Sequence, residues 1–114
     1  MTHERFHYTF GNTMSRGDSD EAYERWVVPE SRNIPRSTLT TAARVDFTRD
    51  HAPLVFLAGD TDHLTPVELI RRNASRYELE VEVHEFAHRS HLICNQDGWE
   101  EVADTAFDWV DSVD

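Results

Sequence analysis

The strongest constraint on the fold is an apolar run, Leu54 to Ala58, that is followed by a helix-start signal. A continuous apolar run of this length is typical of a parallel strand that is covered on both faces. The sequence Thr65-Pro66-Val67-Glu68 has the spacing of a capping box with proline at the first helical position, so a helix is predicted to follow the strand. The apolar residues at helical spacing in this segment are Val67, Ile70, Ala74 and Tyr77.

A second strand and a second helix are predicted further along the chain. Leu79, Val81 and Val83 alternate with polar residues, which is the period of a strand. A second capping signal, Asp97-Gly98-Trp99-Glu100, precedes a helical apolar stripe. The stripe consists of Trp99, Val102, Ala103, Ala106, Phe107 and Val110. The order strand, helix, strand, helix predicts an α/β fold in which residues 53–114 form a right-handed βαβα unit with parallel strands.

Residues 1–52 are predicted to form an irregular, partly helical segment ahead of this unit. Within it, Asp18 is a plausible cap for a short helix that Pro29 ends. Residues 30–50 give weak signals that are compatible with a loop or a short helix.

Composition narrows the class of protein and its partners. The 114 residues suffice for one modest core, and the single cysteine, Cys94, excludes an internal disulfide and is expected to be a packed thiol. The formal net charge of −11, with no lysine, argues against a nucleic-acid partner. No apolar run approaches membrane-spanning length and the first residues lack the apolar core of a signal peptide, so we expect a cytoplasmic protein with no membrane partner.

An acid and a histidine follow the two predicted strands. Asp62 lies in the loop after the first strand, with Asp60 as the alternative acid, and His91 lies in the loop after the second. Since open α/β sheets place their sites at the carboxyl ends of strands, the two side chains are expected to lie near one another. An acid and a base are two of the three parts of a hydrolytic triad.

Three segments carry a resemblance to a known family. Gly59 to Pro66, Glu85 to His91 and Gly98 to Ala103 resemble the C-terminal third of an α/β-hydrolase. In that family a strand ends in Gly-x-x-Asp with the triad acid last, and the next strand leads to a loop that ends in Ser-His. The resemblance therefore implies that Asp62 is the triad acid and His91 the triad base of an esterase-like or lipase-like hydrolase. The segment Phe6 to Thr13 resembles part of the lid of bacterial members.

The chain departs from this family at the nucleophile. The family's Gly-x-Ser-x-Gly elbow is absent, and the nearest match, Thr13 to Gly17, lacks the first glycine and has no buried strand before it. We thus expect a partial α/β-hydrolase fold. The chain is expected to be inactive alone and to use no cofactor. Because an open strand edge promotes association, the expected protein partners are a complementing hydrolase chain or a second copy of this chain. Once such a chain supplies the nucleophile, a small ester-like substrate is the expected ligand. The alternative is a non-catalytic remnant or interaction module.

Three other patterns suggest a zinc site, a Mg²⁺ or Ca²⁺ site and an acyl pocket, and each is weaker than the case for Asp62 and His91. The segment His84 to His88 matches the zinc-protease motif His-Glu-x-x-His, but that motif needs a helix and the residues before it have strand period. Asp60, Asp62 and His63 offer too few oxygens for Mg²⁺ or Ca²⁺. An aromatic cluster is typical of core or interface, and lining an acyl pocket is its alternative role. The cluster consists of Phe6, Tyr8, Phe10 and Trp26.

Overall fold

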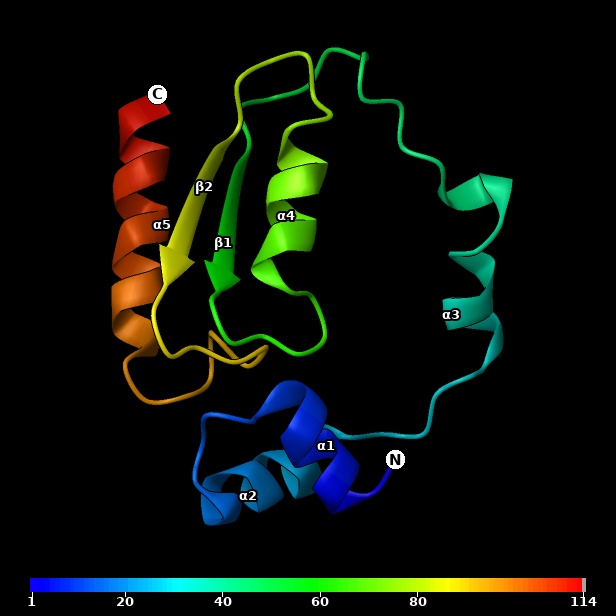
Figure 1. Cartoon of the computed structure of the whole chain (residues 1–114), viewed down its shortest axis with the longest axis vertical. Helices are drawn as coiled ribbons and strands as arrows, with labels where there is room; N and C mark the ends of the chain where they lie inside the picture. Colours follow the sequence, from blue (N-terminus) through cyan, green and yellow to red (C-terminus); the bar gives the residue numbers. More distant parts are fainter. Residues whose placement is uncertain (114) are drawn as a thin grey trace.

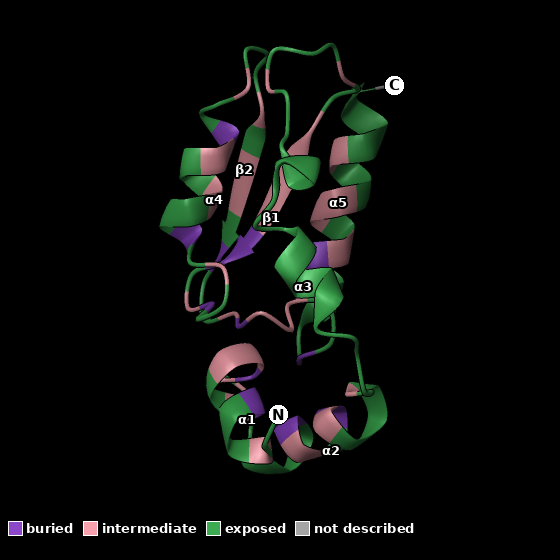
Figure 2. Ribbon diagram, turned by 90° about the vertical axis from the view of Figure 1, so that its right-hand side faces the viewer, coloured by how far each residue is buried: buried purple, intermediate pink, exposed green. Residues whose placement is uncertain are grey.

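The computed structural model describes residues 1–113 and has a mixed α/β fold (Figure 1). Strands β1 (Val55–Gly59) and β2 (Glu82–Phe86) are parallel, and helix α4 (Val67–Ala74) connects them. Helix α5 (Trp99–Val113) follows β2. Figures 1 and 2 both show the two strands between α4 and α5, so one helix covers each side of the pair. The predicted α/β class and the strand–helix–strand–helix order are confirmed.

The core of the βαβ unit lies where the helices meet the strands. In the sheet register Val55 pairs with Glu82 and Gly59 pairs with Phe86. The side chains buried there are Ala58, Val67, Ala74, Phe86 and Val102. The helical spacing of Val67 and Ala74 thus predicted the buried face of α4 correctly. The second strand is shorter than its pattern, because Leu79 is exposed and β2 begins only at Glu82.

The N-terminal region forms a pair of helices, α1 (His3–Phe10) and α2 (Arg16–Trp26). Phe6 is buried, with its ring 5.2 Å from that of Phe10 and 5.5 Å from that of Tyr23. The predicted cap of α2 is wrong. Its N-cap is Ser15, whose hydroxyl accepts the Asp18 amide at 3.1 Å, so the helix starts before Asp18.

Residues 28–46 form an arch that leaves the body of the protein (Figure 1). The arch contains the short helix α3 (Asn33–Ser37) and the 3₁₀ turn η1 (Thr41–Ala43), and every residue from 28 to 46 is exposed. Short helical turns were one of the two options that its weak sequence signals allowed.

The expectation that β1 is covered on both faces is only partly met. Ala58 and Gly59 are buried, but residues 55–57 are half-exposed. The described sheet has two strands, so one edge of β1 has no neighbour among residues 1–113. Within the same residues, no helix combines the length and apolar character needed to cross a bilayer.

Candidate functional site

The structure brings Asp62 and His91 together at the carboxyl ends of the two strands. Asp62 lies three residues beyond β1 and His91 five residues beyond β2. Because the strands are parallel neighbours, their following loops meet at one edge of the sheet. His91 Nδ1 lies 2.9 Å from Asp62 Oδ2, which is a hydrogen bond between the predicted acid and the predicted base.

The Asp62 carboxylate is held by its own loop as well as by the histidine. Oδ1 accepts the backbone amides of Leu64 at 2.7 Å and Thr65 at 2.9 Å. Oδ2 accepts the Thr65 hydroxyl at 2.6 Å. The predicted capping box is wrong, because α4 begins at Val67 with Pro66 as its N-cap, and Pro66 forms no side-chain cap bond. Thr65 thus lies one residue before the cap, and its hydroxyl donates to Asp62.

These contacts lower the pKa of Asp62. Burial is the largest single influence and raises the pKa, since it disfavours the charged form. The hydrogen bonds from Thr65, His91 and the Leu64 amide stabilise the carboxylate and together outweigh burial. Asp62 is therefore ionised at neutral pH and can only accept hydrogen bonds. It follows that His91 Nδ1 carries the proton that is shared with Asp62.

The lowered pKa of Asp62 predicts an acid-dependent loss of stability. A carboxyl whose folded pKa lies below its unfolded pKa, which is about 3.8 for Asp62, stabilises the fold at pH values above that unfolded pKa. This contribution disappears as the pH falls through the folded pKa. At pH 7 we expect Asp62→Asn to lower the free energy of unfolding by about 1–3 kcal/mol. The measurement is urea unfolding of both proteins at several pH values between 7 and 2. The difference should shrink below about pH 4, and a difference that stays constant would contradict the account.

His91 keeps one ring nitrogen available. Its side chain is 33% exposed, and Nε2 has no hydrogen-bond partner among the described residues. The ring packs edge-on against Phe10, with 5.2 Å between the centroids. The Leu92 amide donates to the Phe10 carbonyl at 3.1 Å, which joins the end of α1 to the histidine loop. The N-terminal helical region thus touches the candidate site through Phe10.

A buried hydrogen-bond network fixes the loop that carries His91. Gln96 Oε1 accepts the Ser90 amide at 2.8 Å and the Ser90 hydroxyl at 2.7 Å, and Ser90 is fully buried. Arg89 donates to the backbone carbonyls of Asp97 and Gly98 and pairs with Glu101 at the start of α5. These bonds stabilise one loop geometry, so the imidazole is oriented by its surroundings as well as by Asp62.

Asp60 has a different contact from Asp62. Asp60 Oδ1 accepts the backbone amide of His88 at 2.7 Å. His88 has a left-handed backbone with a φ of 57°, and this bond holds the turn after β2. Of the two candidate acids, the structure therefore places Asp62 against the histidine.

The other predicted patterns do not form sites. His84 and Glu85 lie in β2, so the His-Glu-x-x-His residues are on a strand and a turn and lack the helical geometry of a zinc protease. Among residues 1–113, no three or more potential ligands from His, Cys, Asp and Glu gather in a way that could hold a metal ion. Cys94 is exposed and not packed, because it lies in a surface turn.

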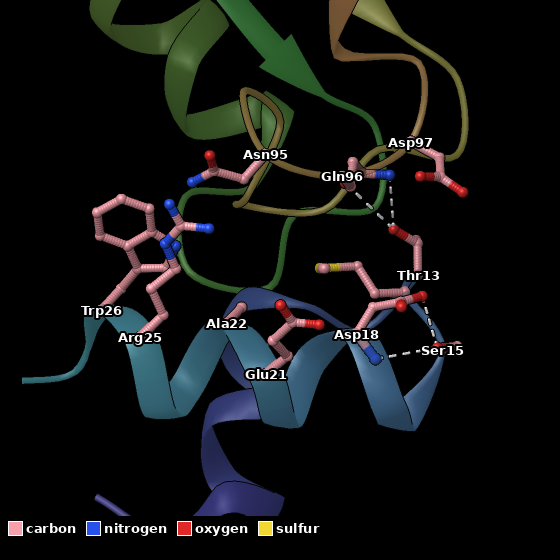
Figure 3. Close-up of a pocket in the computed structure, with 11 residues that line it drawn as sticks. Thr13, Ser15, Asp18, Glu21, Ala22, Arg25, Trp26, Asn95, Gln96 and Asp97 are labelled. Carbon is pink, nitrogen blue, oxygen red and sulfur yellow. Dashed lines mark hydrogen bonds between the residues drawn. The ribbon is translucent and has the colours of Figure 1, made fainter.

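The predicted aromatic cluster does not line one pocket. Phe6 is in the helical core, Tyr8 is exposed and packs on His63, and Phe10 contacts His91. Trp26 lines a separate cleft of about 560 Å³ between α2 and residues 95–97. Figure 3 shows Trp26 and Arg25 at one end of this cleft, and neither Asp62 nor His91 is among its lining residues.

Sequence reasoning missed three residues that position the pair: Thr65, Gln96 and Phe10. The Thr65 contact has a sequence signal, since an aspartate often accepts amides two and three residues ahead. Gln96 and Phe10 have no local signal, because each reaches the histidine loop only through the tertiary fold.

Comparisons with protein-family models, curated proteins and solved structures find no match for this chain. The case for a function therefore rests on the geometry of Asp62 and His91.

Proposed function

We propose that the chain supplies the acid and base of an ester-hydrolysing site of the α/β-hydrolase type and receives its nucleophile from a polypeptide segment beyond residues 1–113. The observation that carries the proposal is the hydrogen bond from His91 Nδ1 to the buried carboxylate of Asp62. Asp62 fixes the tautomer, which leaves Nε2 free to accept a proton. This is the arrangement in which a histidine activates a serine and later protonates the leaving group.

In this mechanism His91 acts on two successive nucleophiles. Nε2 takes the proton of the serine as it attacks the ester carbonyl, and returns it to the departing alcohol. A water molecule then attacks the acyl-serine while Nε2 accepts its proton, and Nε2 passes that proton to the serine oxygen as the acid product leaves. Asp62 stabilises the imidazolium in both steps and is held for this role by the Thr65 hydroxyl and amide. Phe10, which packs against the ring, limits how His91 turns.

The second candidate is a non-catalytic interaction module, and the open edge of β1 favours it. An activated ester separates the two, because an imidazole can act on p-nitrophenyl acetate without a serine. The assay uses the Cys94→Ser background, so that the exposed thiol does not react.

We expect hydrolysis above the buffer rate that His91→Ala lowers severalfold, whereas His63→Ala leaves it nearly unchanged. His63 is a suitable control because its Nδ1 contacts the Tyr8 carbonyl and no carboxylate. Equal rates for the three proteins would reject an activated base and favour the interaction module.

A further inference from the structure

The chain exposes more surface than a compact protein of its size. Its accessible surface is 8515 Å², whereas a compact protein of 13.3 kDa exposes about 6,500 Å². Its radius of gyration is 15.9 Å, against about 13 Å for a compact chain of this length. The excess surface is about 2,000 Å², which is more than one partner contributes to a stable interface, about 800 Å².

One edge of β1 is open in the described part of the chain. The Glu82 amide bonds to the Leu54 carbonyl and the Asp60 amide to the Phe86 carbonyl, so even-numbered residues of this segment face β2. The backbone groups of Val55 and Leu57 consequently point to the opposite edge, which no described residue pairs with. A short apolar strand with a free edge is a template for a further strand.

A cleft lies beside this strand. It has a volume of about 700 Å³ and separates the arch, residues 28–46, from β1 and α4. Figure 1 shows β2, β1, α4 and the arch in this order across the view, and Figure 2 shows the arch passing in front of the strands. The aromatic residues that line the cleft are Phe47, Phe56 and Tyr77. The apolar residues that the arch leaves exposed are Val28, Ile34, Leu39 and Val45.

Two of the eleven arginines of the chain line the cleft. Arg44 and Arg76 both line it, and Arg76 lies over the Phe47 ring at 3.9 Å from the centroid. Neither arginine forms a salt bridge with a carboxylate among residues 1–113. A ligand of this cleft is therefore expected to bring an acidic group as well as apolar side chains.

We propose that the free edge of β1 binds an extended polypeptide of different sequence, which adds a strand parallel to β1 and places a carboxylate near Arg44 and Arg76. The parallel direction of the added strand rests on the proposed function. Only a parallel strand brings its carboxyl end beside Asp62 and His91. A second copy paired across this edge by a two-fold axis would run antiparallel, and two copies of net charge −11 repel one another.

The proposal is tested with peptides selected from a phage-displayed library of random dodecapeptides. Selected peptides should be rich in β-branched residues, contain Asp or Glu, and protect the Val55 and Leu57 amides from hydrogen exchange. Leu57→Pro removes the outward amide but none of the bonds to β2, and should weaken binding at least tenfold. Leu57→Val keeps the amide and is the matched control. The exchange measurement needs no variant, so it decides the matter if the proline variant does not fold.

Three results would overturn the proposal: protection at other amides, unchanged binding by folded Leu57→Pro, or a dimer of the chain alone that protects the Leu57 amide. Binding is measured without any ester. His91→Ala should bind the same peptides, so failure of the hydrolytic proposal and failure of the edge proposal give different results.

Discussion

Asp62→Asn should lower kcat for ester hydrolysis by about 10⁴-fold once the chain is assembled with the polypeptide that supplies its nucleophile. The reason is the tautomer of His91. An asparagine can present its amide NH₂ to Nδ1, which then accepts a hydrogen bond and leaves the proton on Nε2, where it blocks general-base action. The rate is measured with a p-nitrophenyl ester, and the far-ultraviolet circular dichroism of the variant checks that it folds.

Asp60→Asn is the matched control for this experiment. Asp60 lies in the same loop, but among residues 1–113 its carboxylate accepts only the His88 amide, an interaction that an asparagine oxygen can retain. We expect this variant to keep kcat within a fewfold of the parent. A loss of less than tenfold in Asp62→Asn, or an equal loss in both variants, would contradict the role of Asp62.

Gly59→Ala should destabilise the protein by about 1–3 kcal/mol, as overpacking of a filled site does, and should separate His91 from Asp62. A methyl group at Gly59 would meet the Arg89 carbonyl, with its carbon 2.8 Å away, and the Ser90 oxygen at 3.0 Å. Both neighbours are backbone atoms that the Gln96 and Arg89 hydrogen bonds hold in place. The histidine loop must therefore move for the methyl group to fit.

Urea unfolding and the side-chain NMR signals of His91 measure the two effects. Gly17→Ala is the control, since a methyl group there comes no closer than 3.8 Å to the Ser15 hydroxyl and Gly17 lies in the first turn of α2. Its stability should be unchanged or slightly raised, because alanine favours a helix. Equal stability of the two variants would show that the loop is not packed against Gly59 as described.

The meeting of Asp62 and His91 could be predicted from the sequence because it depends on topology. Two parallel strands joined by one helix bring their carboxyl-end loops to the same edge, whatever the loops contain. The Gly-x-x-Asp spacing of the resemblance favours Asp62 over Asp60 as the acid, and in the fold Asp62 contacts His91 whereas Asp60 accepts the His88 amide.

The errors in prediction have physical causes. Thr65 is predicted to cap α4, but the helix begins one residue later than that prediction requires, so Pro66 occupies the N-cap position and the Thr65 hydroxyl donates to Asp62 instead. Ser15 precedes Asp18 and caps α2 in its place, because both residue types suit that position. The arch gave weak signals because its few apolar residues follow neither helical nor strand period.

The central claim is that Asp62 holds His91 as a base with its proton on Nδ1, and nitrogen–proton NMR correlation of the histidine side chains tests it most directly. We expect the neutral ring of His91 to be the Nδ1-protonated tautomer, and we expect Asp62→Asn to shift it to the Nε2-protonated form. An Nε2-protonated His91 in the parent chain, or a tautomer that Asp62→Asn leaves unchanged, would contradict the account.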